Sequence, residues 1–311
     1  MPIRTLRHHL FTLDWAAMVQ PRRALVALAF GLVCLIWGTT WAAIQIGLRG
    51  IPPFSGVAIR FAIAATVLLA VAWATGVRLG RTRRERMLWL GNGILSFIIA
   101  YGVVYWSEQW IPSGLAAVLF ATYPLFVAIV GHFGLPNEAV SPRELVGIAV
   151  GFGGVGVIFS EDVTLGGPEV YLAALVMLIS PLAAAFGTVA VKRWGSGIHP
   201  FSLAGGPMAV ASGVMGMLAV WLERTRTFVW NFESIGSILY LAICGSAVAF
   251  FLYYWLLSIL PAKRLALTAY IIPLVAVLVG MLRGESFHSQ VLVGGALVVT
   301  GVALAVGRRR S

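Results

Sequence analysis

Residues 101–108 carry a row of side chains that could bind a small solute. Tyr101, Tyr105 and Glu108 are spaced i, i+4 and i+7, which places two hydroxyls and a carboxylate on one face of a helix. A buried Tyr hydroxyl needs a hydrogen-bond partner, so this row either bonds to neighbouring helices or faces a water-filled cavity. Tyr253 and Tyr254 add two hydroxyls in the second half of the chain. These side chains could stack on a solute and form hydrogen bonds to it.

A second group of this kind lies nearer the N-terminus. Trp37 and Trp41 are four positions apart, so they share one helix face, and Thr40 lies beside them. Most other Trp residues lie near the ends of apolar runs, where amphipathic rings anchor at lipid headgroups. This pair lies inside its run. It therefore either packs against lipid and helices or lines a cavity.

Two prolines interrupt apolar runs near their middles. Pro124 and Pro273 each remove a backbone hydrogen bond and free the carbonyl four residues earlier, at Phe120 and Ala269. In hydrocarbon such a carbonyl needs a partner, so the kinks either flank one binding site or only shape the packing. The candidate site residues in these two regions are Phe120, Tyr123, Pro124, Ala269, Tyr270 and Pro273.

Charged residues are rare inside the apolar runs. Arg60 lies about a turn and a half into its run, and a charge at the centre of a membrane helix costs about 2.5 to 3.5 kcal/mol. It either extends toward the membrane surface or binds a substrate carboxylate or a neighbouring helix. Glu108 and Glu138 lie at run ends, so no carboxylate marks the centre of a span as a proton relay, and the coupling ion stays open.

The composition excludes an ordinary soluble domain. The 311 residues are 60% hydrophobic and 11% charged, and the mean hydropathy is +0.93. A helix needs about 20 apolar residues to cross a membrane core of about 30 Å. Cys34 and Cys244 fall inside apolar runs and are interpreted as packing residues. The sequence predicts ten transmembrane helices, at 24–44, 55–75, 87–106, 113–133, 144–160, 169–191, 201–221, 235–257, 263–282 and 290–307.

The basic residues follow the loops and give no sign of a nucleic-acid-binding domain. The loops on one side of this ten-helix arrangement hold most of the 22 Lys and Arg residues, including the runs 78–86 and 308–310. The loops on the other side hold only four, at Arg49, Arg224, Arg226 and Arg283. Because cytoplasmic loops carry the excess of Lys and Arg, both termini are predicted to be cytoplasmic.

The sequence is duplicated. IPPFS at 51–55 recurs as IHPFS at 198–202, and prolines and glycines further along recur at offsets of 147 or 149 positions. Tyr254 is the counterpart of Tyr105 in this repeat. An odd number of helices in each half makes the second half enter the membrane from the opposite side. The predicted fold is therefore all-α, with two inverted five-helix repeats, an arrangement that suits alternating access around a central cavity.

The segments CLIWGTTWAAIQIGL, EQWIPSGLAAVLFATYPLFVAIVGHF and GESFHSQVLVGGALVVTGVAL, together with the duplicated layout, resemble the EamA-type family of the drug/metabolite transporter superfamily. Members of that family are bacterial inner-membrane exporters of amino acids and other metabolites, so the resemblance implies this kind of function. It implies ten helices around a central cavity, with a basic residue often found at the position of Arg60. The predicted organisation is a cytoplasmic segment 1–23, a first repeat 24–160, a linker 161–168, a second repeat 169–307 and a cytoplasmic tail 308–311.

The favoured function is that of a secondary transporter, an exporter of small metabolites such as amino acids, with aromatic or amphipathic solutes preferred. The alternatives are a sugar-phosphate or nucleotide-sugar exchanger, which needs more cations than the spans contain, and a passive channel. An integral-membrane enzyme would need clustered His, Asp, Glu, Ser or Cys at one depth, and the sequence shows no such cluster. We expect a small-molecule substrate and the lipid bilayer as partners, and no cofactor, metal or nucleic acid.

Overall fold

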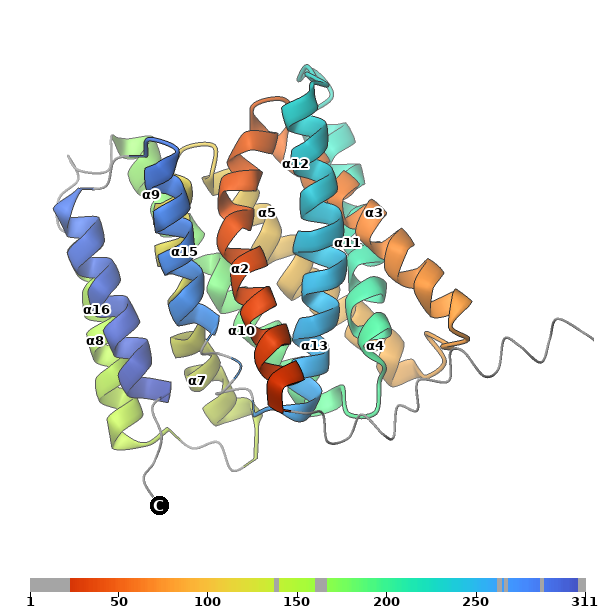
Figure 1. The fold of residues 1–311 in the computed structure, drawn as a ribbon, viewed down its shortest axis with the longest axis horizontal. Coiled ribbons are helices and arrows are strands. Elements are labelled where there is room, and N and C mark those ends of the chain that lie inside the picture. Colours follow the sequence, from red (N-terminus) through yellow and green to blue (C-terminus); the bar gives the residue numbers. More distant parts are fainter. Residues whose placement is uncertain are drawn as a thin grey trace, which may run out of the picture.

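The computed structural model describes residues 23–136, 140–159, 167–261, 265, 268–285 and 288–306, and these residues form helices joined by short loops without any strand. The predicted tail 308–311, Glu138 and most of the segments 1–23 and 161–168 lie outside the described residues. The all-α prediction is confirmed for the described part (Figure 1). The helices of the first half are α2 (Arg23–Leu48), α3 (Pro53–Ala74), α4 (Arg83–Asn92), the π-helix η2 (Gly93–Ile99), α5 (Ala100–Ser107), α6 (Ser113–Phe120), α7 (Tyr123–Gly134) and α8 (Pro142–Ile158). The helices of the second half are α9 (Pro168–Met177), α10 (Ile179–Trp194), α11 (Pro200–Leu222), α12 (Phe232–Ala242), the π-helix η4 (Ile243–Val248), α13 (Ala249–Ile259), α15 (Thr268–Leu282) and α16 (Ser289–Val306).

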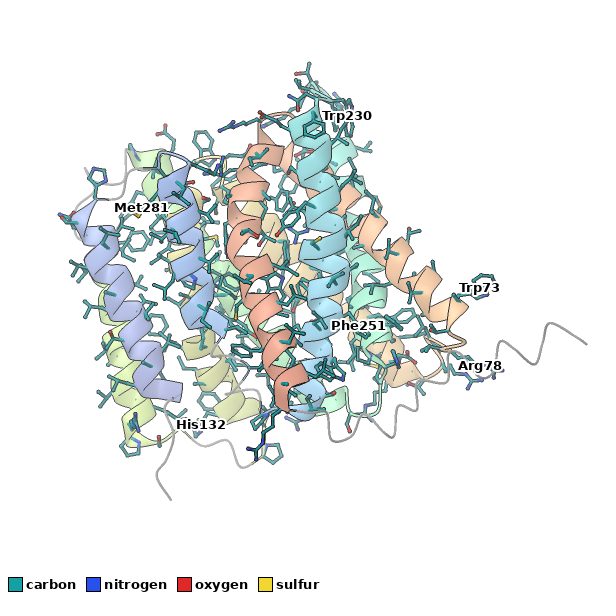
Figure 2. The ribbon with its side chains drawn as sticks, viewed as in Figure 1. Trp73, Arg78, His132, Trp230, Phe251 and Met281 are labelled. Carbon is teal, nitrogen blue, oxygen red and sulfur yellow. The ribbon has the colours of Figure 1, made fainter. Side chains whose placement is uncertain are left out.

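The outer surface of the bundle is apolar, as a membrane requires. Large hydrophobic side chains such as Leu28, Trp73 and Met281 are exposed, and Figure 2 shows side chains of this kind along the helices. Exposed apolar surface of this extent marks contact with lipid. Within the described residues, seven helical stretches are long and apolar enough to cross a membrane, and two further apolar helices, over 271–282 and 289–304, are shorter. The protein is thus a multi-pass membrane protein, and the count of ten spans stays a prediction.

Local sequence explains where several helices begin. The two related corners at 51–55 and 198–202 each place a proline at the first position of a helix, Pro53 of α3 and Pro200 of α11. Proline suits this position because the first amides of a helix have no intrahelical partner. At the start of α8, the Ser141 hydroxyl accepts from the Glu144 amide and the Glu144 carboxylate accepts from the Ser141 amide, a complete capping box.

The packing of the helices shows the inverted repeat. The corresponding helices α3 and α11 pack against each other, and so do α8 and α16. The start of α3 meets the end of α11, where Ser55 donates to Glu223, so the two helices run in opposite directions. In the other pair, Gly154 of α8 lies against Gly294 of α16, and Gly301 lies against the earlier Gly147. Antiparallel contact between corresponding helices is the arrangement that an in-plane two-fold axis produces.

The two prolines predicted to kink their helices behave differently. The fourth predicted span is divided into α6 and α7, and Pro124 lies at the beginning of α7. By contrast, Pro273 lies inside α15.

The third and eighth predicted spans share another irregularity. Each contains a π-helical segment, η2 at Gly93–Ile99 and η4 at Ile243–Val248, and the two segments correspond at the repeat offset of 149. A π-helical turn disturbs the regular ladder of backbone hydrogen bonds and is frequent at functional sites. The sequence of these spans is apolar apart from Asn92 and a few Ser and Tyr residues, and it gives no signal of this feature.

Candidate functional site

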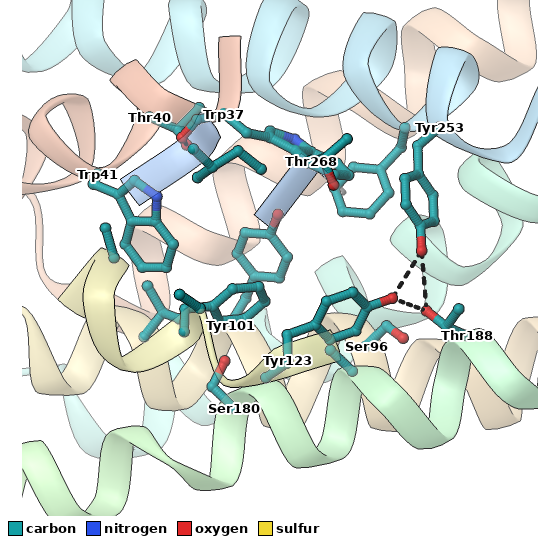
Figure 3. A pocket seen from close by; sticks show the side chains of 18 of the residues that line it. Trp37, Thr40, Trp41, Ser96, Tyr101, Tyr123, Ser180, Thr188, Tyr253 and Thr268 are labelled. Atoms are coloured by element: carbon teal, nitrogen blue, oxygen red, sulfur yellow. Dashed lines mark hydrogen bonds between the residues drawn. The ribbon is translucent and has the colours of Figure 1, made fainter. Parts of the chain in front are cut away.

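A cavity lies in the centre of the bundle, and corresponding helices of the two repeats form its wall. The first repeat contributes α2, the η2 and α5 pair and the α6 and α7 pair, and the second contributes α10, α13 and α15. The remaining corresponding pairs, α3 with α11 and α8 with α16, supply none of the lining residues. The lining consists of Trp37, Thr40, Trp41, Ile44, Ser96, Ala100, Tyr101, Val104, Ala117, Phe120, Ala121, Tyr123, Ser180, Ala184, Thr188, Phe250, Tyr253, Tyr254, Thr268, Ile272 and Pro273 (Figure 3).

Aromatic rings cover much of this wall. On one side, Trp41 packs against Phe120 with ring centroids 5.4 Å apart, and Phe120 stacks on Tyr123 at 5.7 Å. On the other side, Trp37 lies 5.1 Å from Phe250 and 5.2 Å from the ring of Tyr253. These separations are within the range of favourable aromatic contact. The cavity therefore presents flat apolar faces to any molecule that enters it.

Hydroxyl groups form a network at one end of the cavity. The Tyr123 hydroxyl lies 2.7 Å from the Thr188 hydroxyl and 2.8 Å from the Tyr253 hydroxyl, and Thr188 and Tyr253 are 3.3 Å apart (Figure 3). These residues come from α7, α10 and α13, so the network joins both repeats. It fixes the orientation of two rings in the cavity wall.

Two other polar atoms of the lining have no hydrogen-bond partner among the described residues. They are the indole Nε1 of Trp41 and the hydroxyl of Ser180, and both are buried. Buried polar groups are almost always paired, so an unpaired one needs an explanation. Both residues line the cavity, Trp41 from α2 and Ser180 from α10, and Figure 3 shows both away from Tyr253 and Thr188. A bound solute could supply the missing partners.

Arg60 lies immediately behind the cavity wall. Its guanidinium is fully buried and donates to the Ser246 hydroxyl at 2.7 Å, the Gly245 carbonyl at 3.2 Å and the Tyr105 hydroxyl at 3.4 Å. It also lies over the ring of Tyr101, with 4.7 Å between the guanidinium carbon and the ring centroid. Gly245 and Ser246 belong to η4, so the π-helical segment is where the guanidinium binds. Arg60 therefore connects α3 to η4 and to Tyr101, a residue of the cavity wall on α5.

The structure brings most of the predicted site residues together. Arg60, Tyr105, Glu108 and Pro124 are buried and lie outside the lining, whereas Ala269 and Tyr270 belong to α15 and their side chains lie outside the described part. The predicted residues that line the cavity are Trp37, Thr40, Trp41, Tyr101, Phe120, Tyr123, Tyr253, Tyr254 and Pro273.

Sequence reasoning missed the contribution of α10. Ser180, Ala184 and Thr188 line the cavity, and their i, i+4, i+8 spacing places two hydroxyls on one helix face. In the second repeat α10 takes the place that α2 takes in the first, so the repeat itself indicates that this helix also lines the cavity. Ser96 and Thr268 were also missed, since a single hydroxyl in an apolar run gives little signal.

The chemistry of the site is that of binding. No lining residue in the described part carries a formal charge, and the described residues contain no group of three His, Cys, Asp or Glu side chains able to hold a metal ion. Eight aromatic side chains and several hydroxyls can stack on a solute and hydrogen-bond to it. This is the composition of a typical small-molecule site, apolar with a few placed polar groups.

Comparison with known proteins gives one consistent result. The model of the EamA-like transporter family matches the chain twice, over residues 24–160 and 171–307. The inner membrane transporter YedA of Escherichia coli strain K12, itself described as uncharacterized, is 32% identical over 281 residues, which are 88% of each chain. An uncharacterized transporter of Archaeoglobus fulgidus is 29% identical over 91% of this chain and 99% of its own. A chain of known crystal structure shares the fold, with a TM-score of 0.68 and 21% identity over 91% of this chain and 97% of its own.

Proposed function

The chain belongs to the EamA-like transporter family, and on that premise we propose that it is a secondary transporter that exports small metabolites by alternating access. The family resemblance predicted from the sequence is thereby confirmed. The observation that carries the proposal is the central cavity, whose wall is built from corresponding helices of two antiparallel repeats. Such a wall can open toward either face if the two repeats exchange their arrangements.

The substrate we propose is an aromatic or amphipathic metabolite such as an amino acid. The rings of Trp37, Trp41 and Phe250 offer stacking surfaces for an apolar body. The unpaired donors of Trp41 and Ser180 offer hydrogen bonds to the polar end of the same molecule. A sugar phosphate or nucleotide sugar suits this cavity poorly, because a multiply charged phosphate needs cationic partners and the described lining has none.

We also propose that the protein lies in the inner membrane with both termini in the cytoplasm. The name of the relative YedA supports this membrane, and the distribution of Lys and Arg supports this orientation. Single cysteines introduced into the loops at residues 49 and 78 test the orientation. A membrane-impermeant thiol reagent added outside cells should modify position 49 and leave position 78 unmodified, and the reverse pattern would overturn the proposed orientation.

Counterflow in proteoliposomes tests the transport mechanism. Vesicles preloaded with an unlabelled aromatic amino acid should take up the labelled compound faster than empty vesicles. The reason is that the outward transport of unlabelled substrate returns the binding site of a carrier to the outer face. A channel would show no such acceleration. A panel of amino acids, nucleosides, organic cations and sugar phosphates identifies the substrate class, and absence of saturable flux for the whole panel would refute the proposed function.

A further inference from the structure

Glu108 is a buried carboxyl group that does not line the cavity. It follows the last residue of α5, and only 4% of its surface is exposed. Both carboxylate oxygens are buried and have no hydrogen-bond partner in the described part of the chain. An ionised carboxylate without such partners pays a large desolvation cost, so this arrangement is unfavourable for the charged form.

The nearby cations do not form an ion pair with Glu108. Arg60 is the buried cation of this region, but it donates to Ser246, Gly245 and Tyr105, all of which are neutral. Arg283 donates to the backbone carbonyl of residue 42 at 3.1 Å. The single ion pair found within 4.0 Å in the described residues joins Arg49 and Glu233 at the surface.

The other carboxylate of this region is also engaged elsewhere. Glu285 accepts from the Ser113 hydroxyl at 2.5 Å and from the Gly114 amide at 3.1 Å, so it caps the start of α6. Its negative charge acts against ionisation of Glu108. The charged groups that act on Glu108 are Arg60 on α3 and Arg283 and Glu285 after α15. The other charged and titratable groups on α5 and on the helices packed against it are Tyr101 and Tyr105 on α5, Tyr171 and the exposed Glu169 on α9, and Lys192 and Arg193 at the far end of α10.

The neutral acid is the form that fits these surroundings. Glu108 lies just beyond the end of the apolar stretch Arg83–Ser107. Burial, reinforced by the charge of Glu285, raises the pKa of the Glu108 carboxyl well above its usual range, against the opposing effect of Arg60 and Arg283. A metal cation would need several oxygen ligands, whereas one carboxyl group is sufficient for a proton.

Glu108 is also linked to the cavity through its own helix. Tyr105 lies one turn before it and accepts from Arg60, and Tyr101 lies one turn further and lines the cavity. A change of charge at Glu108 therefore acts on the same row of side chains that forms part of the cavity wall. On the basis of the proposed transport function, we propose that Glu108 is a proton-binding site that is occupied in this conformation and releases its proton when this end of the bundle opens to water.

The pH dependence of exchange in proteoliposomes tests this proposal. Counterflow is measured with equal pH on both sides over a range of pH values, for the wild type, for Glu108→Gln and for Glu233→Gln. The wild-type exchange rate should change with pH. The change should reach about tenfold per pH unit where the protonation of a single group limits the rate. Glu108→Gln keeps a neutral side chain at every pH, so its exchange should be independent of pH. Glu233→Gln alters an exposed carboxylate and should retain the wild-type profile.

The outcomes separate the proton site from transport itself. Equal pH profiles for the wild type and Glu108→Gln, or a wild-type rate that does not change with pH, would overturn the proton site and leave transport intact. If no solute is exchanged at any pH, the proposed function fails. In that event, or if a variant does not fold, the proton site is tested on the wild-type protein alone. A hydrophobic carbodiimide, which modifies protonated carboxyls in apolar surroundings, is added to it. Mass-spectrometric detection of modified Glu108 supports the proposal, and unmodified Glu108 overturns it.

Discussion

Replacing Glu223 by Gln should weaken the junction between the two repeats. Glu223 follows the last residue of α11, and its carboxylate accepts from the amide of Phe54 at 2.8 Å and from the amide and hydroxyl of Ser55 at 2.8 and 2.6 Å. These donors belong to the first turn of α3, where backbone amides have no partner within the helix. The carboxylate also interacts favourably with the positive end of the helix dipole.

The magnitude follows from the hydrogen bonds that are lost. A hydrogen bond to a charged group contributes about 1.5 to 3 kcal/mol. Gln retains one acceptor oxygen but places an amide nitrogen, which is a donor, against the donors at the start of α3. Because Glu223 is only 4% exposed, water does not replace the lost acceptor. The free energy of unfolding should fall by about 2 to 3 kcal/mol, and Ser55→Ala, which removes a single donor, should cost about 1.5 kcal/mol.

The assay is chemical unfolding of the purified protein in detergent micelles, followed by tryptophan fluorescence. Differences in the midpoint at constant slope give the change in stability. The control is Glu233→Gln, whose partner Arg49 lies 3.9 Å away at the surface, so it should lose between 0 and about 1 kcal/mol. The double variant Ser55→Ala with Glu223→Gln should lose less than the sum of the single variants, because the two residues share one interaction. Wild-type stability of Glu223→Gln, or strict additivity, would refute this account of the junction.

Two further substitutions test the packing of the repeats and the cavity. In Gly154→Ala the new Cβ would lie 2.5 Å from the carbonyl oxygen of Gly294, so α8 and α16 must separate, and the same unfolding measurement should show a loss of about 1 to 3 kcal/mol. Gly153→Ala meets no atom within 4 Å and should be nearly neutral, and equal losses would count against close helix contact. Trp41→Phe removes the unpaired indole donor and should raise the half-saturating substrate concentration about fivefold in counterflow, with stability unchanged. Trp73→Phe, exposed on the outer surface, is its control, and an unchanged value for Trp41→Phe would exclude this donor from substrate binding.

The positions of the helices were predictable because the signals are local. Each predicted interval contains helix in the structure, and the two related corners at 51–55 and 198–202 each begin a helix. Apolar length and proline position depend only on the neighbouring sequence and on the thickness of the membrane. The repeat could also be predicted, since matched prolines and glycines reflect the same backbone requirements in both halves.

The division between cavity wall and buried support was not predictable. The spacing of Tyr101, Tyr105 and Glu108 correctly places them on one helix face, yet only Tyr101 lines the cavity. Tyr105 is covered by α3, where it contacts Arg60. Helical periodicity defines which side chains share a face, but it does not say which neighbouring helix covers one part of that face. That depends on how the helices cross, and the sequence of a single helix does not contain this information.

The duplicated corners show how far the repeat constrains the structure. Ser55 and Ser202 occupy the same place in the two copies, and each donates to a buried carboxylate, Glu223 for the first and Glu85 for the second. The acceptors do not correspond, because Glu223 follows α11 whereas Glu85 lies in the first turn of α4. A helix start has unsatisfied backbone donors wherever it occurs. In the first copy Glu223 also accepts from the amides of Phe54 and Ser55, whereas in the second copy the amide of Phe201 donates to Nδ1 of His199. The repeat therefore conserves the demand for hydrogen bonds, and the two halves meet it with different residues.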